Sequence, residues 1–125
     1  MNENQIAYIL VGIFLKVHRV LGPGLLESVY EEVICYELRK AGLSYLRQQG
    51  IKVIYDEIVM DIGFRSDIIV EGKVIVEIKS VEGITPVVPK ILLTYLRLSG
   101  RKLGLLVNFN VALIKDGITR IVNGL

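Results

Sequence analysis

The sequence predicts a mixed α/β fold in which helices cover a sheet in two or three layers, and three observations support this class. Apolar residues recur at helical spacing through positions 4–40. Two runs in the middle of the chain are rich in isoleucine and valine, as strands are. A helical stretch that starts at a proline then separates these runs from a later apolar strand. We therefore expect one α/β domain over residues 1–125.

Two helices are expected in the N-terminal third of the chain. Residues 4–20 repeat apolar side chains every three or four positions, which predicts an amphipathic helix. The sequence LGPG at 21–24 ends this helix, because proline and glycine favour a turn. A second helix is expected over 25–40, and the sequence AGL at 41–43 ends it after two basic residues that suit a helix C-terminus.

The rest of the chain is expected to form strands interrupted by one helix. The two central strands carry apolar side chains almost without a break, so we expect both faces of the sheet to be covered. The expected elements are one or two strands over 44–64, strands over 65–70 and 73–81, a helix over 89–99, a strand over 102–109, and a hairpin over 112–122 with its turn at Asp116-Gly117.

The composition is strongly apolar for a chain of this length. Hydrophobic residues make up 52% of the 125 residues, and the mean hydropathy is +0.52. Such a chain either has a dense core or buries apolar surface against a partner, for which a homodimer is the usual solution. The net charge of +2 arises from mixed charges, which permits nucleic acid as a ligand without requiring it.

The composition also excludes several functional classes. Cys35 is the only cysteine, which excludes a disulfide framework and a cysteine zinc site and suits a reducing, cytoplasmic location. His18 is the only histidine, which excludes a histidine-rich metal site. The apolar stretch at 6–15 is shorter than the ~20 residues that span a bilayer and has no basic leader, so no membrane partner is expected.

Three charged residues interrupt the apolar central strands: Asp67, Glu77 and Lys79. Side chains alternate along a strand, so Glu77 and Lys79 share a face. Asp67 joins them only if the turn between the strands has an odd length, for instance centred on Gly72, which would place Asp67 opposite Glu77. An even turn between Glu71 and Gly72 would put Asp67 on the other face, and the sequence permits both registers.

The chemistry of these three residues has two interpretations. Two carboxylates that face each other across strands repel, and a hard divalent cation would relieve that repulsion. A lysine two residues along the strand could orient a water molecule or stabilise charge on a phosphate, so the combination suits phosphodiester cleavage. A cross-strand salt bridge from Lys79 to Asp67 or Glu77 explains the same residues without any site.

Longer segments of the sequence resemble a known family. Asp67 followed by Glu77-Ile78-Lys79 resembles the core motif of the PD-(D/E)XK nuclease superfamily. The sequence GLLESVY at 24–30 resembles Gly-x-x-Glu-x-x-Tyr, the motif that names the GxxExxY family within that superfamily. The resemblance covers nearly the whole chain, through VHRVLGPGLLESVYEEVICYELRKAGL, DIIVEGKVIVEIKSV and LLTYLRLSGRKLGLLVNF.

The resemblance implies a restriction-endonuclease-like core with a mixed sheet of about four or more strands flanked by helices. It implies a nuclease that hydrolyses phosphodiester bonds with Mg²⁺ or Mn²⁺, and we expect DNA rather than RNA as the substrate. Asp67 and Glu77 would ligate the metal, with the backbone carbonyl of Ile78 as an extra ligand. Lys79 would be the catalytic lysine. Glu27 would add a carboxylate from the second helix, so we expect three carboxylates within reach of one ion.

Other residues in the matching segments have more than one interpretation. Glu27 could simply favour the start of its helix, where exposed N–H groups attract anions. Tyr30 could hydrogen-bond a site carboxylate, or it could be a core aromatic with its hydroxyl at the rim. Arg47 and Gln48 could contact phosphate, brace the site or simply pack at the surface. His18, at the end of the first helix, is expected to have a structural or supporting role.

The segment before and within the third helix departs from the family pattern. Tyr95 is present, but Ile91 stands where relatives usually carry a glutamine, and Val88 stands where a histidine is common. These apolar residues favour an alternative function, a catalytically weakened nuclease-fold module that binds nucleic acid or a protein partner. Basic residues nearby could form a phosphate-binding edge or a solvated helix face: Lys90, Arg97, Arg101 and Lys102.

Overall fold

The structure is a computed structural model that describes residues 1–125, apart from the side chain of Ile62. Its sheet has five strands in the order β1-β2-β3-β4-β5. The pair β3 and β4 is parallel and the other neighbouring pairs are antiparallel, so the sheet is mixed. The elements are α1 (Glu3–Leu21), α2 (Glu27–Lys40), β1 (Tyr45–Tyr55), β2 (Ile58–Val70), β3 (Val74–Lys79), α3 (Val87–Ser99), β4 (Leu103–Asn108), the short 3-10 helix η1 (Ile114–Gly117) and β5 (Ile118–Val122).

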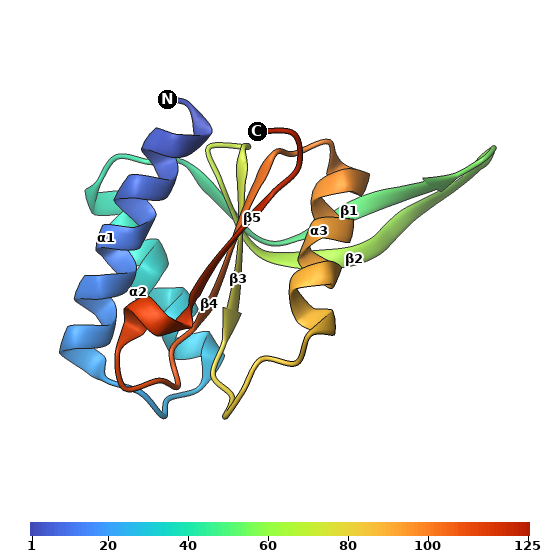
Figure 1. The fold of residues 1–125 in the computed structure, drawn as a ribbon. Coiled ribbons are helices and arrows are strands. Elements are labelled where there is room, and N and C mark those ends of the chain that lie inside the picture. The colour runs from blue at the N-terminus through green and yellow to red at the C-terminus, as the bar shows by residue number, and fades with distance from the viewer.

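The molecule has three layers, with α1 and α2 on one face of the sheet and α3 on the other (Figure 1). Alternate residues of β3 face opposite layers, because side chains alternate along a strand. Val76 and Ile78 belong to the larger core under α1 and α2. Ile75 belongs to the smaller core with Leu92 and Leu96 of α3. The predicted mixed α/β class with a doubly covered sheet is therefore confirmed.

The expected N-terminal helices are confirmed. Helix α1 starts with a capping box in which the Asn2 side chain accepts a hydrogen bond from the Gln5 N–H at 2.8 Å and the Gln5 side chain binds the Asn2 N–H. It ends at Gly22, whose φ of 75° only glycine adopts readily. Helix α2 begins two residues later than expected, at Glu27, because the chain is still extended at Leu26.

Helix α1 is longer than the apolar stretch that the sequence shows at 6–15. By length and composition alone, its 19 residues could cross a membrane, which is weak evidence because the core helix of a globular protein passes the same test. The apolar side of α1 packs into the larger core, where Ile6, Leu10 and Phe14 are fully buried. This packing accounts for its hydropathy.

Helix α3 starts at Val87, two residues before the expected start at Pro89. Pro89 falls in the first turn, where a missing N–H costs no intrahelical hydrogen bond. The helix lies very close to β4, because a Cβ atom added at Gly104 would come within 2.9 Å of the Leu92 side chain. Gly104 therefore sets how closely α3 covers the sheet.

The expected hairpin over 112–122 is wrong. Only Ile118–Val122 forms a strand there, and it pairs with β4 instead. Asp116 and Gly117 lie in η1 rather than in a strand-to-strand turn. A side chain at Gly117 would approach the Asn108 carbonyl oxygen to 2.2 Å, so the glycine is needed for the close return of the chain toward β4.

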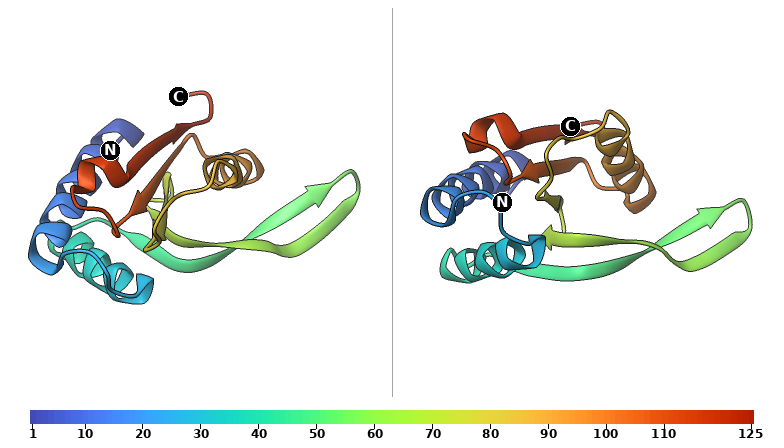
Figure 2. Two further views of the ribbon diagram at one scale, coloured as in Figure 1. Left: turned by 60° about the horizontal axis from the view of Figure 1, so that its bottom comes forward. Right: turned by 90° about the horizontal axis from the view of Figure 1, so that it is seen from below.

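Strands β1 and β2 form a long hairpin that projects from the body of the molecule (Figures 1 and 2). Its inner part pairs β2 with β3 at Ile68–Val70, and its outer part pairs β1 with β2 from Val53 to Ile58. A register shift between Ile51 and Val53 bends the hairpin. We call residues 52–63 the arm.

Candidate functional site

The turn between β2 and β3 has the odd register that brings Asp67 opposite Glu77. Ile68 pairs with Val76 and Val70 with Val74, so the two strands are symmetric about Gly72. Gly72 has a φ of +65°, which a glycine adopts without strain. One step beyond the last paired residues, the same register aligns Asp67 with Glu77. Of the two registers that the sequence permits, the odd one centred on Gly72 is therefore the one that forms.

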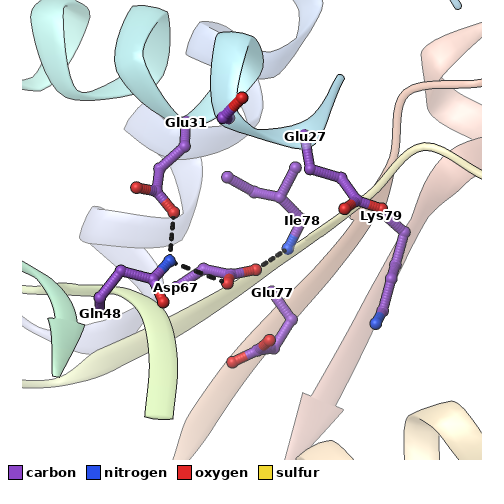
Figure 3. A pocket seen from close by; sticks show the side chains of 8 residues that line it. Glu27, Glu31, Gln48, Asp67, Glu77, Ile78 and Lys79 are labelled. Carbon is purple, nitrogen blue, oxygen red and sulfur yellow. Dashed lines mark hydrogen bonds between the residues drawn. The ribbon is translucent and has the colours of Figure 1, made fainter. Parts of the chain in front are cut away.

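The Asp67 carboxylate binds the backbone of β3. Its Oδ2 accepts a hydrogen bond from the Ile78 N–H at 2.8 Å, and its Oδ1 accepts one from Gln48 Nε2 at 3.3 Å (Figure 3). The backbone pairing between β2 and β3 stops at Ile68, one residue earlier. The side chain of Asp67 thus satisfies an N–H that the neighbouring strand would otherwise satisfy.

Glu77 has the most perturbed carboxyl group of this site. Burial and the negative charge of Asp67 raise the pKa of Glu77 to about 8. Burial also raises the pKa of Asp67, against hydrogen bonds from Ile78 and Gln48 that favour the charged form. Within the part of the chain that the structure describes, the buried Oε1 atom of Glu77 has no hydrogen-bond partner. A buried acceptor without a partner is costly, so this oxygen lacks a proton donor or a cation.

These residues line one open pocket of about 300 Å³. It gathers four carboxylates and one lysine between α2, β1, β2 and β3, which Figure 3 shows from close by. Its lining residues are Glu27, Ser28, Glu31, Gln48, Asp67, Glu77, Ile78 and Lys79. The structure therefore brings together every residue for which the sequence predicted a metal-binding or catalytic role.

Glu27 contacts the end of β3 rather than the other acidic residues. Its Oε1 accepts a hydrogen bond from the Ser80 N–H at 3.2 Å, and the Ser80 hydroxyl donates to the Leu25 carbonyl at 2.6 Å. Figure 3 shows the carboxylates of Glu27 and Glu77 pointing in different directions. Glu27 therefore joins the start of α2 to the strand that carries Glu77 and Lys79.

Three carboxylates do not converge on one point. Among the residues that the structure describes, no group of three or more His, Cys, Asp or Glu side chains is arranged to hold a metal ion. The expectation that Glu27, Asp67 and Glu77 lie within reach of one ion is therefore not met in this structure. Mg²⁺ commonly binds through one or two carboxylates and keeps several waters, so the fit depends on Asp67 and Glu77.

The residues of this pocket fit a hard divalent cation. The anionic side chains that line the pocket are all carboxylates, whose oxygens are the ligands that Mg²⁺ and Mn²⁺ prefer. The buried Glu77 Oε1 has no other partner among the described residues. Burial and, after it, repulsion from Asp67 raise the pKa of Glu77, and a bound cation would oppose both effects.

Glu31, one turn after Glu27 on α2, is a pocket residue that the sequence reasoning missed. Its carboxylate is buried and accepts hydrogen bonds from Arg47 Nε at 3.0 Å, Arg47 Nη2 at 2.9 Å and Gln48 Nε2 at 2.7 Å. Glu31 lies four residues after Glu27 and therefore on the same face of α2, and this spacing could have identified it from the sequence. Arg47 also pairs with Glu32 at 2.8 Å. Arg47 and Gln48 therefore brace the site, one of the three roles left open.

Gln48 connects this brace to Asp67. Its amide donates to Glu31 and to Asp67, and its backbone has a φ of 49°, in the left-handed region. A residue other than glycine in this region costs on the order of 1 kcal/mol or more and persists where contacts hold it. The two carboxylates on either side of its amide provide such contacts.

Tyr30 and His18 lie in the core beneath the site, outside the pocket. Tyr30 is fully buried and stacks on Phe109 with ring centroids 4.2 Å apart. Its hydroxyl donates to the Gly22 carbonyl at 2.6 Å and accepts from the Leu25 N–H at 3.2 Å. The hydroxyl thus braces the loop before Glu27 instead of binding a carboxylate. His18 Nε2 lies 2.9 Å from the Val111 carbonyl, which agrees with a structural role.

A smaller, more apolar pocket of about 110 Å³ lies on the α3 side of Glu77 and Lys79. Tyr95 lines it and stacks on Phe64 with ring centroids 3.9 Å apart. Burial and the carboxylates of Glu77 and Asp67 raise the pKa of Tyr95. Ile91 and Val88 complete the apolar wall, so the departure from the family pattern changes the polarity of this side of the site.

The basic residues near α3 are divided between two roles. Arg101 is held against the turn between β2 and β3, where its Nε donates to the Gly72 carbonyl at 3.0 Å, and burial lowers its pKa. Lys90 and Arg97 are exposed on α3. Arg101 therefore supports the turn that sets the register, and the two helix residues remain available to a ligand.

A mixed sheet flanked by helices, with an acidic pair and a lysine at the end of a central strand, defines the restriction-endonuclease-like class of folds. The chain belongs to the PD-(D/E)XK nuclease superfamily, whose family model matches residues 4–121. Searches of curated proteins and of solved structures gave no match. Membership indicates a nuclease-type function on nucleic acid in a superfamily that generally uses divalent metals.

Proposed function

We propose that the protein is a divalent-metal-dependent nuclease that hydrolyses phosphodiester bonds in nucleic acid. One observation carries this proposal: Asp67 lies opposite Glu77 beside Lys79, and a buried Glu77 oxygen is left without a partner among the described residues. In a site that served only to hold the sheet together, a salt bridge would be expected to satisfy that oxygen.

Asp67 and Glu77 would hold Mg²⁺ or Mn²⁺, with the backbone carbonyl of Ile78 as a further ligand. When bound, such an ion polarises a phosphate oxygen and lowers the pKa of a water molecule. Lys79 shares the face of Glu77 and lines the same pocket, so its ammonium group would stabilise negative charge on the phosphate and orient the attacking water. Glu77 must lose its proton before it can act as a ligand.

The residues around these four groups position them. Gln48 holds Asp67, and Glu31 and Arg47 hold Gln48, so the acidic pair depends on a chain of hydrogen bonds from β1 and α2. Tyr30 fixes the loop that places Glu27 at the start of its helix. Tyr95 borders the site from α3.

Several finer assignments belong to the same proposal. We assign the chain to the GxxExxY family because GLLESVY at 24–30 carries Glu27 and Tyr30 in the motif positions. We propose DNA rather than RNA as the substrate, a cytoplasmic location, a single domain over residues 1–125 and a homodimer. The family match over 4–121 and the lone buried Cys35 support the domain and the reducing compartment.

A second function is favoured by the apolar side of the site. Ile91 and Val88 line the pocket beside Glu77 and Lys79 where the family pattern has polar residues. A nuclease-fold module that has lost activity and binds nucleic acid or a protein partner would retain the fold while tolerating such replacements.

A cleavage panel distinguishes the two functions. The full-length chain is incubated with duplex DNA, single-stranded DNA and RNA in Mg²⁺, in Mn²⁺ and in EDTA. Lys79→Ala and Asp67→Ala test the site, and Lys115→Ala, on η1, serves as the control. Metal-dependent cleavage that disappears in the two site variants and persists in the control supports the nuclease. Binding of nucleic acid without cleavage in any metal supports the inactive module.

A further inference from the structure

The arm presents an apolar sheet face that nothing in the described chain covers. Val53 pairs with Met60 and Tyr55 with Ile58, and paired residues two apart along a strand point to the same face. These four side chains therefore form one apolar face, and the paired Ile54 and Val59, also exposed, make the opposite face apolar too. Tyr55 is 69% exposed and Ile58 is 61% exposed. Figure 2 shows the arm extending past α3 into open space.

An arm of this kind needs a partner to be stable. A two-stranded hairpin is at best marginally stable in water unless it packs on another layer. An exposed apolar strand pair with free edges is also a ready site for association. The four apolar side chains thus point to a surface that is covered when the protein works.

The charge of the arm excludes nucleic acid as that partner. Residues 52–63 carry Lys52 against Asp56, Glu57 and Asp61, one positive and three negative charges, so their net charge is −2. Phosphates would be repelled by such a tip. The partner should instead be apolar and basic.

The outer face of α3 has that chemistry. Val87, Ile91 and Leu98 are exposed there by 55%, 40% and 42%, with Lys90 and Arg97 exposed between them. Their spacing of three, four and seven residues places them along one stripe of the helix. The stripe carries two basic residues, Lys90 and Arg97, and residues 85–102 contain no acidic ones, so the net charge of the stripe is +2.

We propose that the arm of one copy of this chain docks on the α3 stripe of a second copy. The two surfaces are complementary in charge, −2 against +2, and both are apolar. The tip of the arm projects beyond the α3 of its own chain, as the two views of Figure 2 show. A two-fold axis lets both arms dock reciprocally, which closes the assembly as a dimer.

The dimer would bring the two copies together near the site. Ile91 belongs both to the exposed stripe and to the wall of the smaller pocket beside Glu77 and Lys79. The partner's arm would therefore lie at the edge of that pocket. The proposal depends on these two surfaces and is independent of nuclease activity.

Charge reversal in the full-length chain tests the proposal by sedimentation velocity over a range of protein concentrations. The arm variant is Glu57→Lys with Asp61→Lys, which avoids Asp56 because its φ is 53°. The helix variant is Lys90→Glu with Arg97→Glu. We expect a dimeric wild type and, in each variant alone, at least about tenfold weaker dimerisation, because both reciprocal contacts then join like charges.

A mixture of the two variants gives the sharpest result. In a mixed dimer, the basic arm of one chain meets the acidic stripe of the other, and the remaining acidic arm meets the remaining basic stripe. We therefore expect the mixture to form a heterodimer when neither variant dimerises alone. This recovery also shows that both variants are folded.

Two exposed apolar residues provide a matched control. Ile58→Ser should weaken the dimer at least about tenfold, whereas Leu113→Ser, just before η1 and outside both surfaces, should have a smaller effect. The proposal is overturned if the wild type is monomeric, or if its dimer is insensitive to both charge reversals. It is also overturned if the mixed variants fail to associate, or if the arm binds nucleic acid or another protein in place of a second copy.

Discussion

The two ends of strand β2 differ in a way that reverses the usual rule of burial. At the inner end, helices cover both faces of the sheet, and the carboxylate of Asp67 lies beside the buried oxygen of Glu77. At the outer end, Ile58, Val59 and Met60 are exposed in the arm. The 13-residue strand β2 thus has a charged side chain at its covered end and apolar side chains at its exposed end.

Each reversal is costly, and each indicates a missing partner of a different kind. The buried oxygen of Glu77, which lies beside Asp67 and has no donor among the described residues, calls for a cation or a proton. An exposed apolar face calls for a protein surface. The comparison teaches that the same strand can serve chemistry at one end and association at the other, because only its inner residues are paired with β3.

The largest expected effect is a difference in cleavage rate between variants of two β2 aspartates, Asp67 and Asp61. Asp67→Ala should reduce cleavage by about 100- to 1000-fold, the loss typical of removing one group that stabilises a transition state. Asp61→Ala, in the arm of the same strand, should leave the cleavage rate per active site unchanged at a protein concentration that keeps the chain in one assembly state. Initial rates in Mg²⁺ at matched protein concentration measure both. Equal losses in the two variants would contradict the assignment of the site to the inner end.

Two isoleucines of β2 provide the stability counterpart. Ile68→Ala should lower the free energy of unfolding by about 2–5 kcal/mol, because Ile68 is fully buried in the larger core. Ile58→Ala should change it by no more than about 0.5 kcal/mol in the monomer. Urea denaturation at low protein concentration measures both. A large loss in Ile58→Ala under these conditions would show that the arm is packed in the monomer.

Metal addition should stabilise the protein through Glu77, beside the inner end of β2, and not through residues of the arm. An ion present at 100 times its dissociation constant adds about 2.7 kcal/mol to the free energy of unfolding. Thermal unfolding of the wild type in Mg²⁺ or Mn²⁺ should therefore shift upward by several degrees, and the shift should be absent in Glu77→Gln. The Asp61→Ala variant is the control and should shift as the wild type does. A shift of equal size in Glu77→Gln would remove Glu77 from the ligand set.

The pH dependence without metal gives a smaller effect with a defined sign. The pKa of Glu77 rises from 4.5 to about 8 on folding. Between these values the folded chain keeps a proton that the unfolded chain has lost, so the free energy of unfolding falls as the pH rises. The raised pKa of Asp67 acts in the same direction.

Glu77→Gln should therefore be more stable than the wild type at pH 8 by about 1 kcal/mol or more, and the difference should shrink towards pH 5. Urea denaturation in EDTA at several pH values measures it. A difference that stays constant from pH 5 to pH 8 would contradict the raised pKa.

The architecture could largely be predicted from the sequence, since periodicity and turn residues are local properties. The helices and the central strands follow from spacing, whereas the sequence permits both registers at Gly72 and only the strand pairing selects the odd one. The hairpin expected at 112–122 failed because Asp116-Gly117 is a turn signal that η1 also satisfies. The choice between them depends on contacts with Asn108, which are distant in sequence.

The site was less accessible to sequence reasoning for a similar reason. Asp67, Glu77 and Lys79 are charges on apolar strands, which a sequence displays. Glu31 is one of several acids on a helix, and only the fold shows that Arg47 and Gln48 lie against it. The direction of Glu27, towards Ser80 rather than Glu77, depends on where α2 sits above β3. The packing of α2 over the strands depends on contacts between residues far apart in the sequence, so no local sequence pattern predicts it.

The bond from Ile78 N–H to Asp67 has a wider consequence for the shape of the molecule. Because a side chain occupies the place of a strand partner there, β2 is free to leave β3 and follow β1 outward. Strands β2 and β3 therefore separate at Asp67. The pocket lies where they separate, and the arm is the part of the hairpin beyond that point. One aspartate thus leaves room for a ligand and also allows β2 to extend towards another molecule.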